Sequence, residues 1–121
     1  MAKILIADDE LYMRELLQDI LEEAGHVVET AADGVEADAL IGRSPPDLVI
    51  TDILMPRKGG LKLIGDLRSR GCTVPIIAIS GGGKDGKLKF LNTAATFANV
   101  KGLDKPFGHQ ELLDAVAAAL G

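Results

Sequence analysis

The chain has 121 residues with 47% hydrophobic and only 3% aromatic content, so it is long enough for one domain with an aliphatic core and too short for two. Its net charge of −5 argues against non-specific nucleic-acid binding, because such binding needs a basic face that displaces counterions. A single cysteine, Cys72, excludes an intramolecular disulfide framework and indicates a reducing compartment.

The first residues carry no secretion or membrane signal. Met1, Ala2 and Lys3 lead into only four apolar residues before Asp8, too few for the apolar segment of a signal peptide. No apolar run approaches the roughly 20 residues of a membrane-spanning helix. We therefore expect a soluble, cytoplasmic protein that does not contact membranes.

Five short apolar runs predict five strands. Most of the runs are continuous rather than alternating, which is typical of parallel strands covered on both faces. In chain order they are Ile4–Ala7, Val27–Val28, Leu48–Ile50, Val74–Ile79 and, more weakly, Val100–Leu103.

The first helix is predicted between the first two strands. Asp9 is the expected N-cap and Gly25 the expected residue after the C-cap. Apolar residues at steps of three and four form one stripe, which consists of Met13, Leu16, Leu17, Ile20, Leu21 and Ala24.

Four further helices follow in alternation with the strands. Asp33, with Glu36 three residues later, predicts a capped start for the second helix, which ends near Gly42 and Pro45. The third, fourth and fifth helices are predicted over Gly60–Arg70, Lys84–Phe97 and His109–Leu120.

Five strand–helix units in strict alternation indicate an α/β domain built on a parallel sheet. The crossovers must be right-handed, and five strands are too few for a closed eight-stranded barrel. We therefore predict a flavodoxin-like, doubly wound, five-stranded sheet of order 2-1-3-4-5 with five helices, formed by residues 1–121 as a single domain.

Polar residues follow the strands at the edge where open parallel sheets bind ligands. In the predicted order the first and third strands are neighbours, so Asp8, Asp9 and Asp52 share one edge. Ser80 ends the fourth strand and Lys105 follows the fifth, which places both nearby.

Each of these residues also has a structural explanation. Asp8 and Asp9 could cap a helix, Asp52 could start a turn, and most lysines are solvated surface residues. These explanations do not account for the shared edge, where three carboxylates would repel one another. Mg²⁺ prefers oxygen ligands from few protein groups, so the cluster predicts a magnesium site.

Three stretches carry a specific resemblance to a known family. Residues 4–10 (Ile-Leu-Ile-Ala-Asp-Asp-Glu), 46–56 (Pro-Asp-Leu-Val-Ile-Thr-Asp-Ile-Leu-Met-Pro) and 103–107 (Leu-Asp-Lys-Pro-Phe) resemble the signature stretches of response-regulator receiver domains of two-component signalling. Gly60-Leu61 and residues 75–80 also match the family pattern, in the right order and spacing. The chain is similar to the single-domain, chemotaxis-regulator-like members from about residue 3 to residue 120.

The resemblance implies that Asp52 is a nucleophile that accepts a phosphoryl group. It implies that Asp9 binds Mg²⁺ directly and Asp8 mainly through water. Asp52 itself and the backbone carbonyl of Leu54 would complete the protein ligands.

The resemblance also implies how the signal is read. Lys105 would pair with a phosphoryl oxygen, and the Ser80 hydroxyl would turn inward to hydrogen-bond the phosphoryl group. The Lys105–Pro106 bond is often cis in this family. Gly102 stands where receivers often carry Tyr or Phe, so we hypothesise that signalling uses the loop after Ser80 and the fourth helix instead.

The implied function is a phosphorylation-dependent switch rather than an enzyme, with self-catalysed phosphoryl acceptance and autohydrolysis only. The implied partners are a sensor histidine kinase or histidine phosphotransfer protein and a downstream protein target. The face of the fourth helix, fifth strand and fifth helix is the implied output surface, with phosphorylation-dependent dimerisation through it.

Three alternative readings are weaker. Gly81–Lys87 fits the phosphate-loop pattern G-x-x-x-x-G-K, but Leu88 stands where a Ser or Thr should hold Mg²⁺. A haloacid-dehalogenase-type phosphatase needs a second Asp where Leu54 stands. A constitutive docking module would need none of the predicted pocket residues. Gly81–Lys87 could also be a plain connector or a hinge, and its glycines favour neither.

Overall fold

Five parallel strands form one sheet in the order β2-β1-β3-β4-β5, as predicted. The computed structural model describes residues 1–80 and 97–121. The strands are β1 (Lys3–Ala7), β2 (Val27–Ala31), β3 (Leu48–Asp52), β4 (Ile76–Ser80) and β5 (Val100–Asp104). Each extends the apolar run that predicted it or shifts its boundary by one or two residues.

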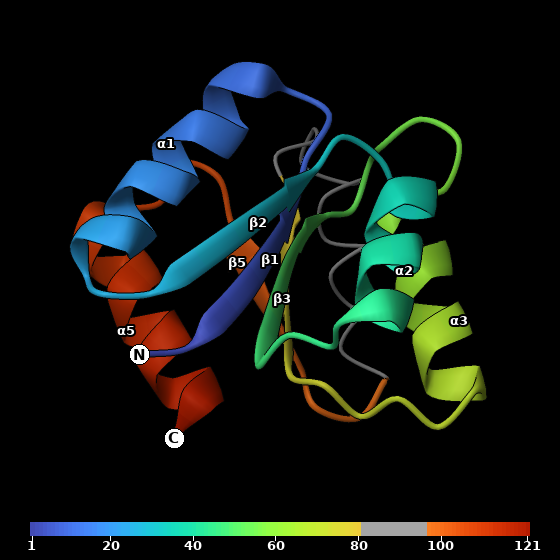
Figure 1. Ribbon diagram of the computed structural model, residues 1–121. Helices are drawn as coiled ribbons and strands as arrows, with labels where there is room; N and C mark the ends of the chain where they lie inside the picture. Colours follow the sequence, from blue (N-terminus) through green and yellow to red (C-terminus); the bar gives the residue numbers. More distant parts are fainter. Residues whose placement is uncertain (81–96) are drawn as a thin grey trace.

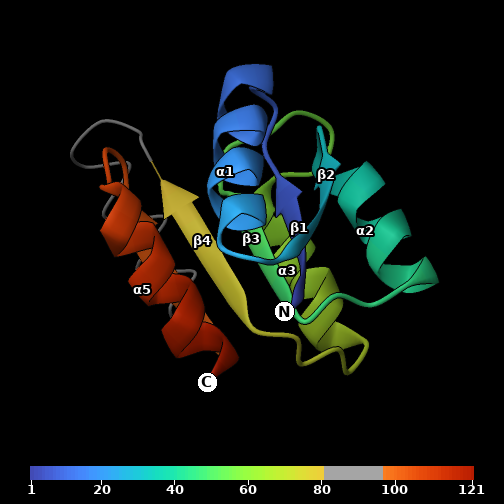
Figure 2. The same cartoon turned by 60° about the vertical axis from the view of Figure 1, so that its left-hand side comes forward.

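The described residues contain four helices on the two faces of this sheet (Figures 1 and 2). None of the four is long and apolar enough to cross a membrane. They are α1 (Leu11–Glu23), α2 (Gly34–Arg43), α3 (Gly60–Ser69) and α5 (His109–Leu120).

The predicted fourth helix, Lys84–Phe97, lies outside the described residues except for Phe97, and so does Gly81–Lys87. The prediction of five helices is therefore confirmed for four of them, and the fourth helix stays a prediction.

Within the described residues, two apolar clusters, one on each face of the sheet, explain why the strand sequences are continuous apolar runs. Alternate strand residues point to opposite faces, so Leu5 and Val49 join one cluster while Ile4 and Ile50 join the other. Residues from α2 and α3 complete the first cluster, namely Ala37, Ile41, Leu63, Ile64 and Leu67. Residues from α1 and α5 complete the second, namely Leu17, Leu21, Leu112 and Val116.

The helix ends follow the predicted signals with one exception. Asp33 caps α2, with its Oδ1 atom accepting the Glu36 amide at 2.9 Å. Gly25 follows α1 with a φ of 97°, a conformation that favours glycine.

The prediction of Asp9 as the N-cap of α1 is wrong. The N-cap position is Glu10, whose own side chain makes no capping bond. The Glu10 amide instead donates to Asp8 Oδ1 at 2.9 Å, so the chain turns around the Asp8 carboxylate and enters the helix one residue later. Asp9 is left exposed at the edge of the sheet.

Candidate functional site

The carboxyl ends of the central strands place polar side chains in an otherwise apolar interior. Asp8 follows β1, Asp52 ends β3 and Ser80 ends β4, and all three are buried. Lys105 follows β5, and its amide donates to the Ser80 carbonyl at 2.9 Å. The parallel register aligns these strand ends, which brings the predicted site residues to one edge.

Three carboxylates converge at this edge. Asp8, Asp9 and Asp52 each offer one oxygen, and the three oxygens lie within 4.8 Å of one another. Asp8 and Asp52 are buried, whereas Asp9 is exposed, so the cluster opens to solvent on one side.

The donor set fits a hard divalent cation. Asp8 Oδ2 is buried and has no hydrogen-bond partner among the residues that the structure describes. A buried carboxylate oxygen without a donor is costly unless a cation compensates it. Carboxylate oxygens from Asp8, Asp9 and Asp52 are ligands that Mg²⁺ prefers.

Both oxygens of Asp52 contact a donor. Oδ2 lies 3.3 Å from the Lys105 ammonium, and Oδ1 accepts the Leu54 amide at 3.3 Å. The same ammonium lies 3.9 Å from Asp8 Oδ2 and 4.0 Å from Glu10 Oε1. Lys105 is therefore a cation inside an acidic pocket, and its ammonium lies nearest to Asp52, the carboxylate that the family resemblance implies as the nucleophile.

The environment of Asp8 disfavours its charge. Burial raises the pKa of Asp8 to about 6, against the effect of the hydrogen bond from the Glu10 amide. The negative charge of Asp52 raises this pKa further, and Lys105 lowers it. Asp8 therefore exchanges a proton near pH 6 when no cation is bound.

Ser80 presents an uncommitted hydroxyl. Its side chain is 1% exposed, and its Oγ atom makes no hydrogen bond within residues 1–80 and 97–121. A buried hydroxyl without a partner is rare and is available to an incoming acceptor.

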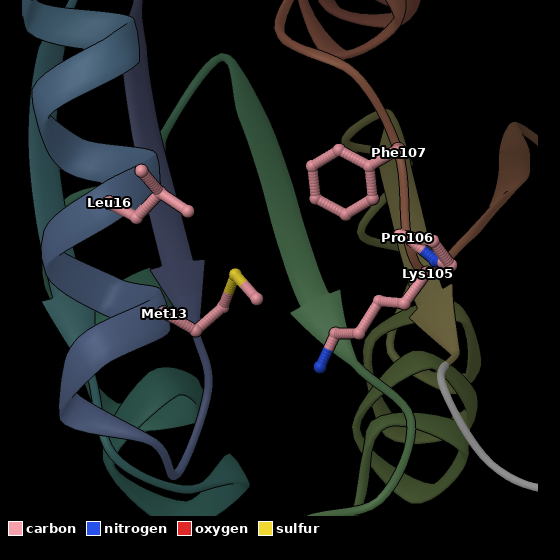
Figure 3. Close-up of a pocket in the computed structure, with 5 residues that line it drawn as sticks. All are labelled: Met13, Leu16, Lys105, Pro106 and Phe107. Atoms are coloured by element: carbon pink, nitrogen blue, oxygen red, sulfur yellow. The ribbon is translucent and has the colours of Figure 1, made fainter.

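A groove of about 390 Å³ adjoins this pocket, between α1 and the chain that follows β5. Met13 and Leu16 of α1 face Pro106 and Phe107 across it (Figure 3). Lys105 also lines the groove, and Figure 3 shows its side chain reaching toward the end of β3. The Lys105–Pro106 bond is cis.

The loop from β3 to α3 brings in a residue that the sequence analysis missed. Lys58 lies in this loop, and its ammonium pairs with Asp38 of α2 and Asp66 of α3. Nothing in the local sequence pattern predicts these contacts, because Asp38 and Lys58 are separated by 20 positions along the chain.

Gly102 of β5 pairs with Ala78, so the position where the resemblance expects an aromatic residue has no side chain.

Comparison with known proteins gives a consistent family. The family model that describes the response regulator receiver domain matches residues 4–117. Response regulator MprA of Mycobacterium sp. (strain KMS) is 38% identical over 126 residues, which cover 98% of this chain and 50% of that protein. Regulator of RpoS of Escherichia coli (strain K12) is 46% identical over 78 residues, which cover 64% of this chain and 23% of that protein. The chain thus spans half or less of the length of these curated relatives.

Solved structures agree with these matches. The chemotaxis protein CheY4 of Vibrio cholerae is similar with a TM-score of 0.86 and 30% identity, covering 99% of both chains. NtrX of Brucella abortus is similar with a TM-score of 0.89 and 32% identity, covering 98% of this chain and 26% of that one. A response regulator receiver domain protein of Clostridium thermocellum has a TM-score of 0.90 and 28% identity, covering 99% and 94%.

Proposed function

This chain belongs to the response regulator receiver domain family, and on that premise we propose that Asp52 accepts a phosphoryl group from a sensor histidine kinase or a histidine phosphotransfer protein. The observation that carries the proposal is the setting of Asp52. Its carboxylate is buried, contacts the Lys105 ammonium and the Leu54 amide, and lies beside two further carboxylates.

The proposed reaction is an in-line transfer to a carboxylate. An oxygen of Asp52 forms a bond to phosphorus while the phosphorus–nitrogen bond of the donor phosphohistidine breaks, and the donor histidine leaves with that electron pair. The Leu54 amide orients the carboxylate, and Lys105 supplies positive charge close to the transferred group. Positioning and charge account for most of the catalysis in such a transfer.

Asp8, Asp9 and Asp52 would hold Mg²⁺, with the backbone carbonyl of Leu54 as a further ligand. When bound, the ion would neutralise negative charge on the phosphoryl oxygens. The buried Asp8 Oδ2 atom supports this assignment, because within the described residues only a Lys105 ammonium 3.9 Å away offsets its charge.

Ser80 would report the modification. Its hydroxyl is buried and uncommitted, so it can donate to a phosphoryl oxygen on Asp52. Because Gly102 carries no side chain, the response would pass through the segment after Ser80 to a downstream protein, with dimerisation through the adjoining face as a further consequence. The protein's own activity would be limited to phosphoryl acceptance and autohydrolysis, in the cytoplasm.

The surface beside the pocket supports a protein as phosphodonor. Asp52 is only 7% exposed, so a donor histidine must come close to reach it. The groove lined by Lys105 adjoins the pocket, and Leu16, which also lines it, is 38% exposed. Leu11 and Tyr12, in the first turn of the same helix, are 60% and 73% exposed. Exposed apolar side chains around a groove are typical of a protein contact.

The test is phosphorylation by a small donor that needs no docking surface. We would incubate the chain with acetyl phosphate and Mg²⁺ and measure its intact mass beside an Asp52→Asn variant. The expected result is a gain of one phosphoryl group that requires Mg²⁺ and is absent from the variant.

A circular dichroism spectrum of Asp52→Asn serves as the folding control. An adduct that persists in the variant would refute Asp52 as the acceptor. No adduct in the wild type, together with no binding of beryllofluoride, would favour a constitutive docking module.

A further inference from the structure

Lys58 joins two helices to the loop that links β3 to α3. Its ammonium lies 2.7 Å from Asp38 Oδ2 on α2 and 2.6 Å from Asp66 Oδ2 on α3. The Lys58 side chain is only 17% exposed, so these contacts are partly shielded from water. Charge-assisted hydrogen bonds of this length define the direction of the side chain as well as its charge partner.

The backbone of Lys58 is held at the same place. Its carbonyl accepts the Gly34 amide at 2.9 Å, at the first turn of α2. A Cβ atom on Gly34 would stand 2.1 Å from that carbonyl oxygen, so the close approach requires glycine. The loop is thus attached to α2 through both the main chain and the side chain of one residue.

The other end of the loop is closed next to Asp52. The Gly60 amide donates to the Ile53 carbonyl at 2.8 Å. A Cβ atom on Gly60 would stand 2.3 Å from the Asp52 carbonyl oxygen. Leu54 lies inside this closed loop, and its amide contacts the Asp52 carboxylate.

We propose that Lys58 is a positioning residue for the candidate site. By clamping the loop to α2 and α3, it holds the Leu54 backbone in place against Asp52, where both contribute to the cation and phosphoacceptor site. This inference rests on the proposed function for its consequence at the cation site, whereas the clamp itself is a property of the fold.

Lys62 shows what an ordinary surface ion pair looks like in the same place. It pairs with the same Asp66 at 3.3 Å, but its side chain is 71% exposed. Exposed ion pairs of this kind contribute little to the stability of the fold. Lys58 differs in burial, in having two carboxylate partners and in carrying the loop.

Lys58→Met is the informative variant, with Lys62→Met as its matched control. Met is unbranched and only one atom shorter than Lys, so it keeps most of the side chain and removes the charge. Asp38 keeps Arg70 and Asp66 keeps Lys62, so neither carboxylate is left without a cation. If Lys58→Met does not fold, Lys58→Gln replaces it, because Gln keeps a donor at that position.

Two measurements on the full chain decide the proposal. Amide hydrogen exchange at Gly34 and Gly60 reports the clamp without any metal. Isothermal titration with MgCl₂ reports the cation site. In Lys58→Met we expect faster exchange at both amides and roughly tenfold weaker Mg²⁺ binding, the effect typical of losing a residue that orients a metal ligand. Lys62→Met should match the wild type in both.

Unchanged exchange in Lys58→Met would overturn the clamp. Faster exchange with unchanged Mg²⁺ affinity would overturn the positioning role. A wild-type chain that binds no Mg²⁺ would instead refute the metal site of the proposed function, and the exchange data would still decide the clamp.

Discussion

The two walls of the pocket differ in chemistry. The wall formed by α2, α3 and the β3–α3 loop is held by ion pairs, from Lys58 to Asp38 and Asp66, and from Arg57 to Asp33 at 2.7 Å. The wall formed by α1 and the chain after β5 is apolar and encloses the groove of about 390 Å³. Figure 1 shows the two pairs of helices on opposite faces of the sheet.

This difference indicates that one wall positions the loop and the other is available to a partner protein. Ion pairs and hydrogen bonds have preferred directions, so the α2/α3 wall can hold a loop backbone in one geometry. Apolar contacts have no preferred direction, so the wall formed by α1 and the chain after β5 can accommodate the apolar side chains of a partner protein, which would displace water from the groove. The wall that includes Leu54, beside Asp52, is thus held by directional contacts, whereas the wall beside Lys105 carries the solvent-accessible groove and is called the open wall below.

The largest effect is expected from filling the contact between α2 and the loop. Gly34→Ala should lower the free energy of unfolding by about 3 kcal/mol, because the new Cβ atom meets the Lys58 carbonyl oxygen. Urea denaturation measures this. Gly42→Ala is the control in the same helix, where a Cβ atom meets nothing within 4 Å. It should stabilise by up to about 1 kcal/mol. Equal stability of Gly34→Ala and wild type would mean that the close contact between Gly34 and the Lys58 carbonyl does not hold the loop against α2.

An intermediate effect is expected from Asp8→Asn in metal-free buffer. The folded-state pKa of Asp8 is about 6 and its ordinary value is 3.8, so the folded chain binds this proton more tightly. Stability therefore falls as pH rises from about 4 to about 6. A shift of this size corresponds to about 3 kcal/mol, which solvent screening on the open side of the cluster reduces to about 2 kcal/mol, and this penalty persists above that range. Asn removes the penalty and keeps an acceptor for the Glu10 amide.

Denaturation of Asp8→Asn at several pH values, with chelator present, checks this. The variant should be more stable than wild type at pH 7.5 and equal to it below pH 4. Asp9→Asn, at an exposed position, should stay within about 0.5 kcal/mol at every pH. A gain in stability for Asp8→Asn that did not vary with pH would contradict the raised pKa of Asp8.

The smallest effect on stability is expected on the open wall. Tyr12→Asp replaces an exposed aromatic side chain with a charged one. Because the position is exposed, the free energy of unfolding should change by less than about 0.5 kcal/mol. It should still slow phosphoryl transfer from a phosphorylated histidine kinase several-fold, with no change from acetyl phosphate. Val35→Asp, 45% exposed on α2, is the control and should leave both rates unchanged. Slower transfer in Val35→Asp alone would assign docking to the other wall.

Local patterns predicted most of the fold. The apolar runs located all five strands, and the signals at Asp33 and Gly25 located two helix ends. The Asp9 cap failed because the turn before α1 depends on the buried Asp8 carboxylate, whose burial is set by neighbouring strands. A periodicity in one segment cannot show what a distant segment buries.

Some features of the candidate site could likewise be predicted from the sequence and others could not. The apolar runs and the polar residues that follow them were enough to predict that Asp8, Asp9, Asp52, Ser80 and Lys105 meet at one edge of the sheet. The raised pKa of Asp8, the cis bond before Pro106 and the contacts of Lys58 depend on the folded chain. Strand and helix patterns can be predicted because they depend on residues that are neighbours in the sequence. Burial, charge pairing and close backbone approach depend on distant segments that folding brings together.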